Sequence, residues 1–181
     1  MRTLLALWLL VAASGTVCAD TLHGVVIVVI DGDTVLFKPD HYSPGSRAFL
    51  KVRLADIDAP ETAQPFGEAA TEVLKARVLK QRAQLEVVAT DAYGRKLGRL
   101  TVDARSVNAE LVRRGLAWAY DSTRASARSG SESFRASARG ADRHGMSALQ
   151  REAQGERIGL WRDAAPTPPW VWRKARATPA Y

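Results

Sequence analysis

The chain has 181 residues and a formal net charge of +7. This length suits one compact domain with extensions, and the basic balance favours a polyanionic partner, either nucleic acid or an anionic membrane surface. Its single cysteine, Cys18, excludes a disulfide framework and a cysteine-based zinc site.

The first 19 residues have the pattern of a secretory signal peptide. Arg2 supplies a positive start, residues 4–11 are apolar, and Val17-Cys18-Ala19 is a small-residue ending. The apolar run is too short for the roughly 20 residues that span a membrane. A lipoprotein would use Cys18 as its anchor, but Val17 is bulkier than such sites usually carry. We expect cleavage after Ala19 and a secreted or periplasmic protein.

The next segments predict strands. Residues 24–30 form a continuous β-branched run that is typical of a buried strand. Asp31-Gly32 is a hairpin-type turn signal, and residues 34–37 predict a second strand. Residues 50–54 alternate between apolar and polar, which predicts a half-buried third strand with Arg53 pointing away from the core.

The remaining elements mix helices and strands. A helix is predicted over residues 66–81 by an apolar stripe at helical spacing. Strands follow at residues 85–89 and 97–102, then helices at residues 107–115 and 148–157. Strands in turn-linked pairs, with a helix after the third, predict an α+β protein built on a five-stranded OB-fold barrel with three helices.

Two segments differ from this domain, which is predicted to span residues 20–161. Residues 121–145 are rich in Ser, Arg, Ala and Gly, a composition that buries too little surface to offset its ordering entropy, so we expect a disordered spacer. Residues 162–181 form a Pro- and Trp-rich tail. Two tryptophans seldom stay in water, so the tail is expected to pack back on the domain.

Acidic residues beside the second and third strands suggest a metal site. Asp33 enters the second strand and Asp58 follows the third, and Ca²⁺ prefers such hard oxygen ligands. The Ala59 carbonyl is a further candidate ligand, because Pro60 favours an extended residue before it. Asp31 could orient a bound water. Alone, Asp31-Gly32-Asp33-Thr34 would be an ordinary turn, and no EF-hand glutamate follows it in register.

A glutamate and two arginines complete a set suited to phosphodiester cleavage. Glu61 lies three residues beyond Asp58, within reach of a water near the metal, as a general base requires. Arg53 and Arg95 can hold the equatorial oxygens of the transition state. Each residue alone equally suits a solvated surface, but the combination favours a metal-dependent nuclease.

These motifs together resemble the staphylococcal nuclease (thermonuclease) family, and the tail resembles that of its Gram-negative secreted members. The resemblance covers about residues 22–161, interrupted by the Ser/Arg-rich segment. It rests on Arg53 and on six stretches, which are Asp31-Gly32-Asp33-Thr34, Asp58-Ala59-Pro60-Glu61-Thr62, Asp91-Ala92-Tyr93-Gly94-Arg95, Val107-Asn108-Ala109-Glu110-Leu111-Val112, Gly115-Leu116-Ala117 and Ile158-Gly159-Leu160-Trp161.

The resemblance implies a Ca²⁺-dependent endonuclease that acts, as a monomer, on single-stranded or flexible DNA and RNA and leaves 3′-phosphate ends. It implies that Asp33, Asp58 and the Ala59 carbonyl bind calcium, that Glu61 is the general base, and that Arg53 and Arg95 bind the scissile phosphate. Tyr93 would help hold a nucleotide phosphate, and Trp118 and Tyr120 would flank the nucleotide.

Two alternatives belong to other classes. A non-catalytic nucleic-acid-binding OB module would explain the fold and the charge, but such a module would usually have lost at least one of the acidic or arginine residues. A basic periplasmic protein that binds anionic envelope polymers would explain the charge but not the acidic cluster. The three histidines do not pair into a nuclease motif, and no Ser-His-Asp arrangement is evident.

Overall fold

The computed structural model describes residues 20–120 and 143–177. The expected signal peptide at residues 1–19 lies outside the described residues. Residues 121–142, most of the expected Ser/Arg spacer, also lie outside them. The expected boundary of that spacer shifts, because residues 143–145 already belong to a helix.

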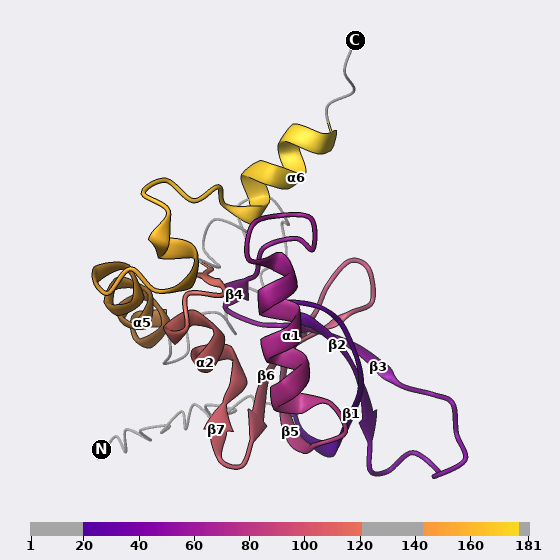
Figure 1. Ribbon diagram of the computed structural model, residues 1–181. Helices are drawn as coiled ribbons and strands as arrows, with labels where there is room; N and C mark the ends of the chain where they lie inside the picture. The colour runs from indigo at the N-terminus through magenta and orange to yellow at the C-terminus, as the bar shows by residue number, and fades with distance from the viewer. Residues whose placement is uncertain (1–19, 121–142, 178–181) are drawn as a thin grey trace, which may run out of the picture.

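Five strands form a closed barrel (Figure 1). They are β1 (Asp20–Asp31), β2 (Thr34–Pro39), β3 (Leu50–Leu54), β5 (Arg82–Thr90) and β6 (Lys96–Val102). Their order is β3-β2-β1-β5-β6, and a parallel pairing of β3 with β6 closes the circle. The predicted OB-fold barrel is confirmed, and closure leaves these strands without a free edge.

Three short strands extend this barrel. β7 (Arg105–Ser106) continues the sheet beyond β6. β4 (Ile57–Asp58) pairs antiparallel with β8 (Trp118–Ala119), which sets Asp58 opposite Trp118. This small second sheet fixes the backbone that follows β3.

The alternating pattern of the strands builds the core. Val35 and Phe37 in β2 and Val52 and Leu54 in β3 are at most 1% exposed, while the residues between them are less buried. Opposite faces of a strand carry alternate residues, so this pattern selects one register. The buried core also includes residues from the helices: Ala70, Leu74, Val78, Val107, Leu111, Val112 and Met146.

Four α-helices lie in the described residues, one more than the sequence predicted. They are α1 (Gly67–Val78), α2 (Val107–Arg113), α5 (Arg143–Gly155) and α6 (Pro169–Ala177), with a 3-10 turn at Gly159–Arg162. The fourth, α6, lies in the Pro- and Trp-rich tail, for which no helix was predicted. Within the described residues, none of the helices has the length and apolar character needed to cross a bilayer.

Local signals explain where the first two helices sit. α1 buries Ala70, Leu74 and Val78 against the barrel; the first two belong to the stripe expected from the sequence, whose other members, Phe66 and Val73, are only partly buried. At the start of α2, the Ser106 hydroxyl accepts the Ala109 N–H at 3.2 Å, a standard N-cap. Gly115 ends this segment at φ +61°, as expected for a left-handed stop.

Candidate active site

The β1–β2 turn presents Asp33 at one end of the barrel. The Asp33 backbone N–H donates to Asp31 Oδ1 at 3.0 Å, so Asp31 shapes the turn that carries its neighbour. Gly32 packs so closely that a Cβ there would lie 2.8 Å from the Cβ of Ala59 and 2.9 Å from that of Ala70. The turn is therefore seated directly on α1 and on the segment after β4.

The chain between β3 and β4 brings Arg53 and Asp58 to the same end. Arg53 pairs with Thr34, next to Asp33, across β2 and β3. The Leu54 N–H donates to the Asp33 carbonyl at 2.8 Å. The turn that follows is held by Asn108, which is fully buried and donates to the Ala55 carbonyl at 2.8 Å.

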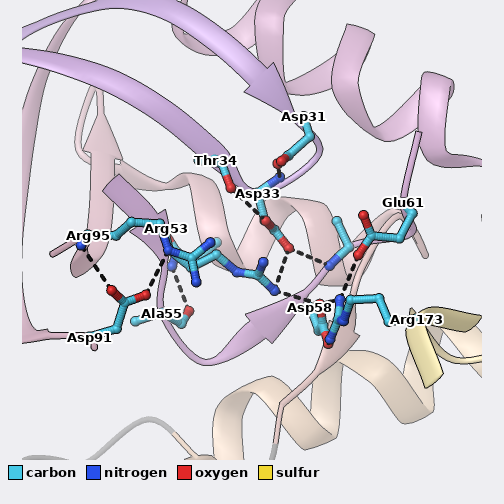
Figure 2. A network of polar contacts seen from close by, with 12 residues as sticks. Asp31, Asp33, Thr34, Arg53, Ala55, Asp58, Glu61, Asp91, Arg95 and Arg173 are labelled. Atoms are coloured by element: carbon cyan, nitrogen blue, oxygen red, sulfur yellow. Dashed lines mark hydrogen bonds and ion pairs between the residues drawn. The ribbon is translucent and has the colours of Figure 1, made fainter. Parts of the chain in front are cut away.

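Two buried carboxylates share one guanidinium (Figure 2). Asp33 is 3% exposed and Asp58 is 1% exposed. Arg53 Nη2 lies 3.0 Å from Asp33 Oδ2 and 2.5 Å from Asp58 Oδ1. The Ala59 N–H also donates to Asp33 Oδ2, at 2.8 Å. The space between the two aspartates is thus one that attracts positive charge.

Electrostatics reflect this crowding. The pKa of Asp33 is raised to about 7, chiefly by burial. Arg53 opposes this rise, and the charges of Asp31 and Asp58 contribute to it. Burial alone would lower the pKa of Arg53, but Asp33 and Asp58 outweigh it and hold that pKa above its ordinary value. Burial of Asp33 therefore outweighs its ion pair with Arg53, and a further cation beside Asp33 would stabilise its charged form.

Glu61 stands beside this pair on the loop that leads to α1. Its backbone N–H donates to Gln64 Oε1 at 2.8 Å, which fixes the loop. Its side chain is 40% exposed and is held by Arg173 of α6, whose Nη1 lies 2.7 Å from Glu61 Oε1. The expected base therefore sits at the mouth of the acidic centre, in contact with solvent.

Arg95 lies at the same end of the barrel as Arg53. The parallel pairing sets Arg53 opposite Leu97, two residues beyond Arg95. Asp91 holds the arginine, because Asp91 Oδ2 accepts from Arg95 Nε at 2.7 Å and Asp91 Oδ1 accepts the Arg95 N–H at 2.9 Å. Tyr93 is 86% exposed, with the Arg95 guanidinium 5.6 Å from its ring centroid. Both side chains can reach a substrate at this surface.

The two other aromatic candidates are placed differently. Trp118 is only 5% exposed and packs edge-to-face with Trp161 and with Trp170, at centroid distances of 5.5 and 6.3 Å. Tyr120 is half-buried, and its N–H donates to the Asp56 carbonyl at 2.9 Å. Trp118 lies next to Asp58 through the β4–β8 pairing, but Trp170 covers it.

The donor set fits a hard, oxygen-seeking cation. Asp33 and Asp58 offer buried carboxylate oxygens on either side of one cationic position, which is the ligand chemistry that Ca²⁺ prefers. No group of three or more His, Cys, Asp or Glu side chains in residues 20–120 and 143–177 has the arrangement of a complete metal cage. Backbone carbonyls and waters would therefore complete the coordination.

Sequence reasoning missed two residues that shape this centre, Arg173 and Gln64. Arg173 donates to both carboxylate oxygens of Asp58, at 3.1 and 2.8 Å, from more than a hundred positions away in the chain. Gln64 is 6% exposed and donates to the Thr167 carbonyl at 3.1 Å, which ties the Glu61 loop to the segment before α6. A buried glutamine two residues before the predicted helix gave no signal of its own.

A closed OB barrel with carboxylates and arginines gathered at one end belongs to the class of small barrels equipped for phosphodiester chemistry. Comparison with known proteins agrees with that class. A family model described as "Staphylococcal nuclease homologue" matches residues 51–163. The chain belongs to this family, and the membership supports a nuclease function.

Three relatives illustrate the family. An Escherichia coli O157:H7 protein called an uncharacterized endonuclease is 34% identical over 172 residues, covering 94% of this chain and 97% of its own. Protein ParB of E. coli is 37% identical over 179 residues, covering 94% and 88%. A micrococcal nuclease of Shigella flexneri is 32% identical over 157 residues, covering 82% and 78%.

Proposed function

We propose that the protein is a Ca²⁺-dependent phosphodiesterase that hydrolyses single-stranded or flexible DNA and RNA. The observation that carries the proposal is the convergence of two buried aspartates, one glutamate and the Arg53 guanidinium at one end of the barrel. A binding surface needs positive charge but has no use for buried carboxylates, which cost free energy unless a cation balances them.

Each residue has a distinct part in this proposal. Asp33 and Asp58, with the Ala59 carbonyl, hold the cation, which would supply electrophilic stabilisation of the phosphoryl oxygens. Glu61 takes a proton from the attacking water, and its partial exposure leaves it accessible to that water. Arg53 and Arg95 donate to the equatorial oxygens, where negative charge develops. The water oxygen bonds to phosphorus in line, the P–O5′ bond breaks, and the product retains a 3′-phosphate.

The test is cleavage of a labelled single-stranded oligonucleotide by the purified protein in Ca²⁺ and in excess chelator. We expect cleavage in Ca²⁺ and none in chelator. Glu61→Gln should lower the rate about 10²–10⁴-fold by removing the base, and Arg95→Ala about 10²–10³-fold by removing a charge-stabilising donor. Glu68→Gln, an exposed change in the first turn of α1, serves as the control and should leave the rate unchanged.

One result would favour the other class of function. Tight oligonucleotide binding without cleavage at any Ca²⁺ concentration would indicate a non-catalytic nucleic-acid-binding OB module. Cleavage that persists in chelator would refute the role given to the metal while leaving the nuclease function in place.

A further inference from the structure

Helix α6 places a guanidinium on the acidic centre. Arg173 Nη1 donates to Asp58 Oδ1 at 3.1 Å and to Glu61 Oε1 at 2.7 Å, and Arg173 Nη2 donates to Asp58 Oδ2 at 2.8 Å (Figure 2). These contacts raise the pKa of Arg173, chiefly through its hydrogen bonds to Asp58. One side chain from the tail thus engages both the proposed metal ligand and the proposed base.

These contacts and a bound metal compete for the same oxygens. Arg173 occupies both carboxylate oxygens of Asp58, and Arg53 shares one of them. A divalent cation on Asp58 would lie beside the Arg173 guanidinium at short range and in a partly buried place, where like charges repel strongly. The guanidinium and a cation would both crowd the same carboxylate and repel each other, so binding of one weakens binding of the other.

The same helix covers a second part of the site. Trp170, in the first turn of α6, stacks edge-to-face on Trp118 at 6.3 Å. Trp118 is one of the aromatic residues that the family resemblance assigns to the nucleotide. Helix α6 therefore contacts carboxylate oxygens of Asp58 and Glu61 and also shields an aromatic side chain beside them.

Helix α6 is attached mainly at its N-terminal end. Pro169 is buried, and the Thr167 carbonyl accepts from Gln64 just before the helix. Figure 1 shows the rest of α6 projecting beyond the barrel, with its C-terminal end pointing away from it. Arg173 itself is 43% exposed. The Arg173 contacts thus lie beyond the anchored end of the helix and apart from the residues of the barrel core.

We propose that α6 is an autoinhibitory latch, in which Arg173 holds Asp58 and Glu61 in the metal-free protein and must leave when a divalent cation binds. This inference rests on the proposed function, because it takes the acidic centre to be the metal site. Coupling between two binding events is reciprocal. The free energy by which the Arg173 contacts stabilise the metal-free form therefore makes the free energy of metal binding less favourable by the same amount.

Calcium titration calorimetry on the wild type and three variants tests the latch. Arg173→Gln should lower the Ca²⁺ dissociation constant about tenfold, equivalent to about 1.4 kcal/mol. Arg176→Gln removes the same charge from the same helix, where the Arg176 guanidinium stacks on Trp172 at 4.5 Å, and should match the wild type. Arg173→Lys keeps the charge but loses the fork of donors, so its Ca²⁺ dissociation constant should lie between those of Arg173→Gln and the wild type.

Tryptophan fluorescence supplies a readout that does not depend on activity. Trp170 and Trp172 lie on α6, so release of the latch should change the emission when Ca²⁺ is added to the wild type. In Arg173→Gln the change on adding Ca²⁺ should be smaller, because the helix is already less tightly held. Circular dichroism of each variant without metal confirms that the fold is retained.

The outcomes separate the latch from the function on which it rests. Equal Ca²⁺ affinity in the wild type and Arg173→Gln, or weaker affinity in the variant, would overturn the latch and leave a calcium-dependent nuclease. Absence of Ca²⁺ binding in every variant would overturn both. Calcium binding by Arg173→Gln alone would support the latch in its strongest form.

Discussion

Asp33 and Asp58 are buried carboxyl groups, whose charged forms cost free energy unless cations lie beside them. Arg53 bridges them, yet the pKa of Asp33 is still raised to about 7, chiefly by burial. Arg173 adds a second guanidinium to Asp58 but has no contact with Asp33 among the described ion pairs. The remaining demand for positive charge beside Asp33 is the physical basis for the proposed metal.

Asp91 gives a prediction at the scale of one residue. Burial alone would raise its pKa, but hydrogen bonds from the Arg95 side chain and from the backbone of Arg95 and Tyr93 outweigh burial and hold the pKa below its ordinary value. A lowered folded pKa means that the stabilisation is present above the unfolded pKa of about 3.9 and is lost as the pH falls through the folded value.

We therefore expect Asp91→Asn to lower the free energy of unfolding by about 1 kcal/mol at pH 7, because the amide cannot replace the charged bond to Arg95 Nε. The difference from the wild type should shrink as the pH falls below about 4. Urea unfolding at several pH values measures it. Asp103→Asn, at an ion pair where Asp103 is 79% exposed, should cost little at any pH. A difference for Asp91→Asn that is constant down to pH 2.5 would contradict this assignment.

At the scale of elements, the strands were predictable and the last helix was not. The apolar residues that alternate in the sequence, such as Val52 and Leu54, are the buried ones in the barrel, because only one face of β3 faces the core. The Pro168-Pro169-Trp170 stretch predicted a tail that packs back on the domain, with no helix assigned to it. A signal for the helix was present nonetheless, since Pro169 occupies the first helical position, where its missing N–H costs nothing.

The candidate site likewise has a part that the sequence predicted and a part that it did not. Asp33 and Arg53 come together because β2 and β3 are neighbours, and local sequence patterns predicted both of those strands. Asp58 lies in β4, a two-residue strand that no local pattern predicted, although it follows β3 closely in the chain. The contact of Arg173 with Asp58 depends on how a distant helix folds back, and no local pattern encodes it. The burial of Trp118 depends on the same helix, through Trp170.

The β1–β2 turn gives a prediction at the element scale. Gly32→Ala would force its new Cβ against the Cβ atoms of Ala59 and Ala70, at 2.8 and 2.9 Å, so the turn must move away from α1. Overpacking of this kind should destabilise the fold by about 1–3 kcal/mol. It should also slow cleavage, because Asp33 and the Ala59 N–H that it accepts are displaced together.

Thermal unfolding and the oligonucleotide assay measure the two effects of Gly32→Ala. Gly45→Ala is the matched control, since nothing lies within 4 Å of a Cβ at that position. It should leave stability unchanged or slightly raised, by well under about 1 kcal/mol. Equal stability of the two variants would show that the close approach at Gly32 does not fix the turn.

At the scale of the whole molecule, the chain carries a positive net charge but has a cluster of acidic side chains at one end of the barrel. The formal net charge is +7, while Asp33, Asp58 and Glu61 concentrate negative charge at one end of the barrel. A polyanion is attracted by the net charge but repelled at the acidic centre unless a cation is bound there. Metal and substrate should consequently favour each other's binding.

Salt dependence tests this arrangement. Using Glu61→Gln in Ca²⁺, so that substrate is bound but not cleaved, log Kd for a single-stranded oligonucleotide should rise linearly with log salt concentration. Each neutralised phosphate contributes about 0.7 to that slope, so the scissile phosphate that Arg53 and Arg95 share would alone give about 0.7. The net charge of +7 should make the slope steeper. Adding Arg95→Ala should reduce it, by at most about 0.7, whereas a slope unaffected by this change would remove Arg95 from the phosphate contacts.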